Sequence, residues 1–103
     1  MTDRQLLELA AKAAGITIVW YGEFDPWCYA EIAPGIKWDP ITDDGDALRL
    51  AVKLRLHVSV FANAIGIGNP VVGYVETPWS EDPYVATRRA IVEAAAEIGR
   101  SNT

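Results

Sequence analysis

The sequence predicts a small α+β domain in which three helices pack on a small, mostly antiparallel sheet. Amphipathic segments with helix-start signals cover residues 2–14, 42–54 and 82–99, and β-branched or aromatic runs lie between them. With 103 residues, 50% hydrophobic and 22% charged, the chain has the length and composition of one folded domain with a modest core. We expect a single domain over residues 1–100, a frayed tail over 101–103, and the order helix, one or two strands, helix, strand, strand, helix.

The first helix is expected to begin at a capping box, because Thr2 is followed three residues later by Gln5. Apolar residues then recur at helical spacing, and Gly15 is the residue typical of a helix end. Residues 16–21 are β-branched and aromatic, which is the composition of a largely buried strand.

The segment after this strand contains three prolines around a short apolar piece, residues 27–32. Both a second strand and an ordered loop fit this piece, and the sequence leaves the two interpretations open between Gly22 and Gly35. Its tryptophan and tyrosine residues make it too aromatic for a disordered linker, so we expect it to pack against the domain.

The middle helix is expected to begin at Thr42 or Asp43, whose side chains can cap exposed backbone N–H groups. Asp44 and Asp46 add negative charge at the positive end of the helix dipole. A broad apolar face is then predicted, made by Leu48, Leu50, Ala51, Val52 and Leu54.

Two further strands, over residues 56–61 and 71–77, are predicted to form an antiparallel hairpin across a loop at residues 66–70. The Gly-x-Gly of this loop is not interpreted as a phosphate loop, because Pro70 supplies no N–H group and no helix follows it.

The last helix is expected to open with Asp82 as its N-cap and Pro83 in the first helical position. Spacing of four places Arg89 beside Glu93. The predicted inner stripe consists of Thr87, Ile91, Ala94, Ala95 and Ile98.

The charge and the targeting signals limit the classes of partner. A net charge of −5 argues against direct nucleic-acid binding, because affinity for phosphates depends on lysine and arginine. The sequence shows neither a signal peptide nor a run of about 20 apolar residues, so no membrane partner is expected and the cytoplasm is the expected location.

Metal and catalytic chemistry find little support in the sequence. Cys28 and His57 are each the single residue of their kind, which excludes an intramolecular disulfide and a zinc motif of paired ligands. The aspartates between residues 39 and 46 could hold Mg²⁺ or Ca²⁺, but they lack the closing Glu of an EF-hand and each has a capping or dipole role. We expect no metal and no cofactor, and a non-enzymatic role is favoured while the question of activity stays open.

The arginines and the aromatic residues supply the binding candidates. Arg88 or Arg89 could clamp an anion through the guanidinium fork, although one of them is expected to pair with Glu93 or Asp46. Trp38 and Trp79 precede helix starts, where a hydrophobic staple belongs, whereas the irregular segment carries rings of the types enriched at interfaces. The candidate binding residues are Trp27, Tyr29, Asp43, Asp44, Asp46 and Arg88.

Two motifs carry a resemblance to a known family. Residues 38–48 read Trp-Asp-Pro-x-Thr-Asp-Asp-Gly-Asp-Ala-Leu, and residues 86–91 read Ala-Thr-Arg-Arg-Ala-Ile before an alanine-rich tail. Together with the leucine-rich first helix that ends in glycine, they resemble the phage ABA sandwich domain family of small proteins from tailed phages and prophages. The resemblance covers nearly the whole chain except residues 22–35, and it implies a phage origin and an accessory role without any catalytic residue.

Three functions follow as expectations. The first is a phage or prophage accessory protein that binds a host or phage macromolecule, with a protein as the expected partner and inhibition of a bacterial defence system as one form. The second is a protein that binds a small ligand or nucleotide, with or without enzymatic activity, through the arginines, the acidic cluster and the aromatic rings. The third is a component of phage assembly, and the sequence does not set the oligomeric state, with a homodimer among the alternatives.

Overall fold

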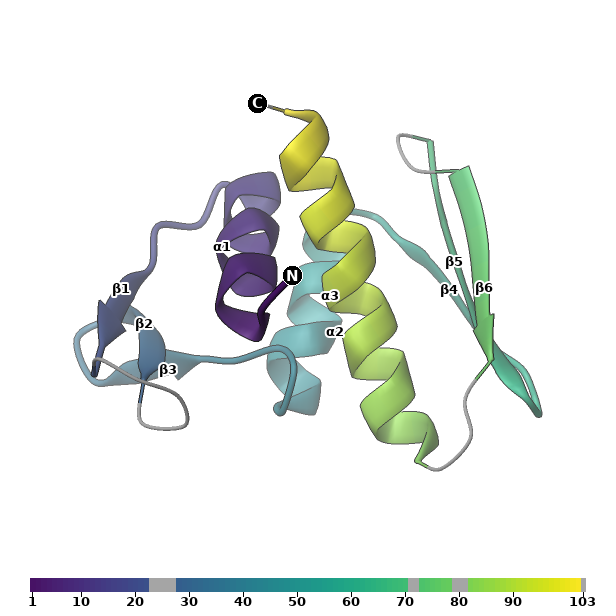
Figure 1. The fold of residues 1–103 in the computed structure, drawn as a ribbon, viewed down its shortest axis with the longest axis horizontal. Helices are drawn as coiled ribbons and strands as arrows, with labels where there is room; N and C mark the ends of the chain where they lie inside the picture. The colour runs from purple at the N-terminus through teal and green to yellow at the C-terminus, as the bar shows by residue number, and fades with distance from the viewer. Residues whose placement is uncertain (23–27, 71–72, 79–81, 103) are drawn as a thin grey trace.

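Three helices occupy the centre of the molecule, and a three-stranded antiparallel sheet lies on either side of them (Figure 1). The structure is a computed structural model, and it describes residues 1–22, 28–70, 73–78 and 82–102. The elements follow the chain in the order α1 (Asp3–Ala14), β1 (Val19–Tyr21), β2 (Tyr29–Ala33), β3 (Ile36–Trp38), α2 (Asp44–Lys53), β4 (His57–Val60), β5 (Ala64–Asn69), β6 (Gly73–Pro78) and α3 (Pro83–Ser101).

The predicted α+β class and the predicted order of helices and strands are confirmed, with three strands where one or two are predicted after α1 and three where two are predicted after α2. The strands are divided between two sheets, with the orders β1-β2-β3 and β4-β5-β6. All the pairs are antiparallel between neighbours in sequence, so each sheet is built from local connections and the helices separate the two.

The helix starts are those that the sequence predicts. Thr2 and Gln5 form the capping box of α1, and Gly15 ends that helix with a left-handed φ of 69°. Of the two candidates for α2, Asp43 is the cap, because its side chain accepts a hydrogen bond from the backbone N–H of Asp46. Asp82 caps α3 with Pro83 as the first helical residue.

The open question at residues 22–35 is resolved for the part that the structure describes. Tyr29–Ala33 is a strand, paired with β1 through Trp20 and Ala30 and with β3 through Ala30 and Trp38. Residues 23–27, including Trp27, lie outside the described residues, as does Trp79. Of the two tryptophans predicted at hydrophobic-staple positions, Trp38 is buried.

The predicted hairpin loop at residues 66–70 is wrong. Residues 66–69 belong to β5, the central strand of its sheet, and the chain reverses earlier, where Phe61 N–H donates to the carbonyl of Ala64. Gly66 leaves room for the ring of Tyr74 on β6 rather than making a turn: a Cβ there would lie 2.2 Å from the hydroxyl oxygen, and the half-exposed ring would have to shift.

The core forms mainly where α1 and α3 pack together, with α2 and β5 contributing further apolar side chains. Ile91, Ala95 and Ile98 of α3 are buried as predicted. Arg89, however, pairs with Asp3 of α1 and not with Glu93, because the close packing of the two helices brings that carboxylate within 3.1 Å.

The predicted apolar face of α2 is only partly correct. Leu50 and Ala51 are buried, whereas Leu48 and Val52 are 64% and 68% exposed. The helix buries the polar residue Asp46 instead, because its carboxylate accepts a backbone hydrogen bond from the preceding loop.

Within the described residues, no helix is long and apolar enough to cross a bilayer.

Candidate functional site

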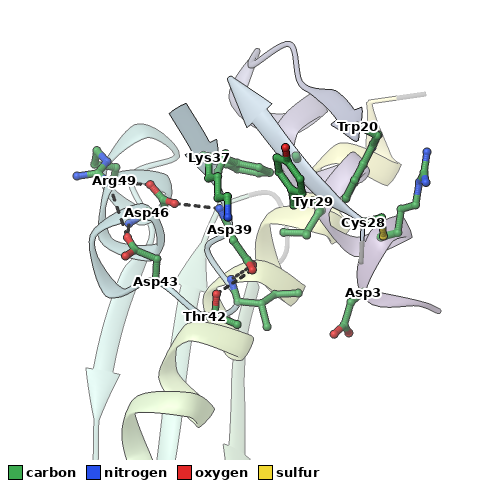
Figure 2. A pocket seen from close by; sticks show the side chains of 15 residues that line it. Asp3, Trp20, Cys28, Tyr29, Lys37, Asp39, Thr42, Asp43, Asp46 and Arg49 are labelled. Atoms are coloured by element: carbon green, nitrogen blue, oxygen red, sulfur yellow. Dashed lines mark hydrogen bonds and ion pairs between the residues drawn. The ribbon is translucent and has the colours of Figure 1, made fainter. Parts of the chain in front are cut away.

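A cavity of about 710 Å³ lies between sheet β1-β2-β3 and the beginnings of α1 and α2. Figure 2 shows Asp43, Asp46 and Arg49 at one side of this cavity, Trp20 and Cys28 at the opposite side, and Tyr29 between them. It therefore collects both chemical classes that the sequence singles out, aspartates and aromatic rings.

The acidic side of the cavity is built by the loop that enters α2. Asp39 folds this loop back on itself, because its carboxylate oxygens accept hydrogen bonds from the backbone N–H of Ile41 at 3.2 Å and the hydroxyl of Thr42 at 2.8 Å. Its own N–H donates to Oδ2 of Asp46 at 2.9 Å, and Asp43 accepts the N–H of Asp46 at 2.8 Å. The three carboxylates are thereby fixed by backbone groups.

Arg49 supplies the positive charge on this side. Its guanidinium lies 2.7 Å from Oδ1 of Asp46 and 3.9 Å from Oδ2 of Asp43. Both oxygens of Asp46 are thus engaged, which agrees with the predicted structural role of the acidic cluster. Among the residues that the structure describes, no group of three His, Cys, Asp or Glu side chains is arranged to hold a metal ion.

The aromatic side is built by the first two strands. The register pairs Tyr21 with Tyr29, and their rings stack with centroids 5.5 Å apart. The ammonium of Lys37 on β3 lies 4.8 Å from the centroid of the Tyr29 ring, at the distance of a cation–π contact. Tyr21 and Tyr29 remain 43% and 39% exposed, so two stacked rings are available at the surface.

A second cation–π pair joins α1 to the same sheet. The guanidinium of Arg4 on α1 lies 4.6 Å from the Trp20 ring and also pairs with Glu8 at 3.2 Å. Lys37, in contrast, forms no ion pair within the described part of the chain. Its cross-strand neighbour on β2 is Glu31, whose Oε1 accepts the N–H of Gly35 at 3.1 Å.

The structure separates the predicted binding residues into two places. Tyr29, Asp43 and Asp46 line the cavity. Asp44 and Arg88 lie outside it and pair with each other at 2.6 Å. Trp27 is outside the described residues.

The guanidinium of Arg88 already bonds groups of the chain itself. Besides its ion pair with Asp44, its Nε donates to the carbonyl of Ile41 at 2.8 Å, and the side chain is only 16% exposed. The predicted pairing of an α3 arginine with Glu93 or Asp46 is therefore replaced by Arg88 with Asp44 and Arg89 with Asp3. An arginine held in this way joins the start of α2 to α3 and is not poised to receive an anion.

Sequence reasoning does not single out Lys37 or Arg4. Both act through ring faces that become neighbours only when the strands pair and α1 packs against them. The available signal is the position of Lys37 next to Trp38 in an aromatic segment, which gives no contact without the register. Cys28 lines the cavity in a half-buried position.

Comparison of the chain with known protein families, curated proteins and solved structures finds no match.

Proposed function

We propose that this chain is a phage or prophage accessory protein that acts by binding a protein partner through an aromatic wall, the stacked rings of Tyr21 and Tyr29 at the edge of the cavity. The observation that carries the proposal is the exposed Tyr21–Tyr29 stack beside the ammonium of Lys37, which forms no ion pair within the described residues. Tyrosine rings fixed by a strand pair lose little conformational entropy on binding and are among the residues most often found as interface hot spots. The phage origin rests on the resemblance of residues 38–48 and 86–91 to the phage ABA sandwich domain family.

The state of the carboxylates favours binding over catalysis. Both oxygens of Asp39 and Asp46 accept hydrogen bonds from groups of the chain itself, which gives these two carboxylates a structural role that accounts for their positions. The expected biological form of such a binder is inhibition of a host protein, including a component of a bacterial defence system.

Native mass spectrometry of the tagged protein, purified gently from its bacterial host, tests the proposal. We expect a stoichiometric protein partner that is retained by the wild type and lost in Tyr21→Ala/Tyr29→Ala. The matched control is Tyr74→Ala, which removes a ring of similar exposure, 54%, from the other sheet. Retention of the partner by the double variant, or its loss in the control, would contradict the assignment of the binding surface.

A small ligand is the second candidate, and the cavity itself favours it. Its volume of about 710 Å³ lies within the range of small-molecule sites, and it combines rings with a few fixed polar groups. The same spectra distinguish the candidates, because a ligand would appear as a small added mass without a second chain. We expect Lys37→Ala to remove that mass if the ligand is anionic.

A further inference from the structure

The outer face of α2 carries an apolar pair that no part of the described chain covers. Leu48 and Val52 are one helical turn apart and are 64% and 68% exposed. Beside them runs a groove of about 510 Å³ between α2, β4 and the beginning of α3, in whose wall Val60 and Tyr84 are 62% and 69% exposed. Large exposed apolar side chains that gather at one place are typical of a protein-binding surface.

The charges at the two ends of this face have opposite signs. Asp44 lies one turn before Leu48; its Oδ1 pairs with Arg88 at 2.6 Å, and its side chain is 70% exposed. Lys53 and Arg55 lie at the other end, where the N–H of Arg55 donates to the carbonyl of Val52 at 3.1 Å. Both of these cations are exposed and form no ion pair within the described residues. The stripe Asp44, Leu48, Val52, Arg55 therefore runs from negative through apolar to positive.

We infer that this stripe binds a second copy of the chain, with the two α2 helices antiparallel about a two-fold axis. In that arrangement Leu48 lies against the partner's Val52, and Asp44 faces the basic end of the partner helix. A two-fold contact requires a self-complementary surface, and this order of charges complements itself only when one copy is reversed. A parallel arrangement would oppose Asp44 to Asp44 and Arg55 to Arg55.

Two further features favour a second copy of the chain on this face. Antiparallel helices bring the negative C-terminal end of one dipole beside the positive N-terminal end of the other. The groove extends the apolar contact from the helix to Val60 and Tyr84, which a single helix pair would leave exposed. The aromatic wall proposed to bind a partner protein belongs to the other sheet, so dimerisation does not depend on the proposed function.

The test is the solution mass of the purified chain as a function of concentration, measured by sedimentation equilibrium. We expect the wild type to reach twice the chain mass of 11.3 kDa at micromolar concentration. Leu48→Asp/Val52→Asp is expected to raise the dissociation constant at least about tenfold, because it places charges in an apolar contact. The matched control, Val19→Asp/Ile36→Asp, changes two side chains of about half exposure on the other sheet and is expected to leave the dimer intact.

Lys53→Glu/Arg55→Glu provides an independent variant that leaves the apolar residues in place. It is expected to weaken the dimer. Added salt is expected to weaken the wild-type dimer, because screening reduces the attraction between opposite charges, and to strengthen the dimer of the variant, because screening reduces the repulsion between like charges. Circular dichroism checks that each variant is folded.

A wild type that keeps the single-chain mass throughout the concentration range overturns the inference. So does a dimer that survives the Leu48 and Val52 changes. If the single chain instead binds a foreign protein that requires these two residues, the face is an interface for that protein, and the inference of a second copy fails.

Discussion

Gly99 of α3 lies directly against the main-chain carbonyl of Leu9 of α1. A Cβ atom on Gly99 would lie 2.0 Å from the Leu9 oxygen and 2.8 Å from its carbonyl carbon. Because both atoms belong to the backbone, no side-chain rotation can make room for them. Gly99 therefore permits the close packing of α1 on α3, the contact around which the core is built (Figure 1).

Gly99→Ala is expected to lower the free energy of unfolding by roughly 2 kcal/mol or more, although alanine is the better helix former. The two helices must move apart to admit the methyl group, which opens gaps in the neighbouring core. Urea unfolding measures the change. Gly45→Ala in α2 is the matched control, because its Cβ would meet only the tips of the Arg49 and Asp43 side chains, at 3.2 Å. Equal effects of the two substitutions would show that the helix contact is looser than described.

The buried carboxylate of Asp46 supports the next prediction. It accepts the N–H of Asp39 at 2.9 Å and the guanidinium of Arg49 at 2.7 Å. Asp46→Ala leaves the Asp39 N–H without its acceptor and is expected to cost about 1–3 kcal/mol, while Asp46→Asn keeps an acceptor and costs less. Arg49→Ala should cost under about 1 kcal/mol, because its side chain is 73% exposed.

Thermal unfolding of the three variants tests this order. A loss from Arg49→Ala as large as that from Asp46→Ala would mean that the ion pair, and not the backbone hydrogen bond, holds the loop before α2.

Much of this fold could be predicted from local signals. The starts of all three helices depend on side chains within a few residues of the cap, so Thr2, Asp43 and Asp82 are visible in the sequence. The division into two sheets depends on which segments pair with one another. From the sequence alone Gly66 suggests a turn, because its close approach to Tyr74 becomes visible only in the structure.

The candidate site divides in the same way. Tyr29 and the aspartates are recognised by residue type, and the hydrogen bonds that fix Asp43 and Asp46 are local. The contact of Lys37 with Tyr29 requires the register of the strands, and the pairing of Asp44 with Arg88 joins residues 44 positions apart. No local pattern encodes either contact.

Arg88 and Arg89 are adjacent in sequence but are expected to respond differently to the same change. Arg88→Lys replaces two separate guanidinium nitrogens, Nε on the Ile41 carbonyl and Nη1 on Asp44, by one shorter-reaching ammonium, and a loss of about 1–2 kcal/mol is expected. Arg89→Lys should stay within about 0.5 kcal/mol, because Arg89 and Asp3 form a pair that is 42% and 56% exposed. Urea unfolding measures both, and similar losses would contradict the description of Arg88 as the tie between α2 and α3.

Tyr74 provides a prediction about pH. The pKa of its hydroxyl is raised above the ordinary value of 10.0, first by desolvation and then by the hydrogen bond to Glu76 and by the charge of that carboxylate. A raised pKa means that the folded chain favours the neutral phenol. The resulting stabilisation is fully present below the pKa of the unfolded chain and is lost as the pH rises through the higher pKa of the folded one.

Glu76→Gln is expected to lower the pKa of Tyr74 toward 10.0, because the amide carries no charge that opposes the phenolate. The measurement is an ultraviolet titration of tyrosinate formation, with the same titration of Tyr74→Phe subtracted to isolate this one ring from the other three tyrosines. An unchanged pKa in Glu76→Gln would assign the shift to desolvation of the hydroxyl alone. In that case Gly66→Ala, whose Cβ would lie 2.2 Å from the hydroxyl oxygen and displace the ring from β5 into water, should lower the pKa instead.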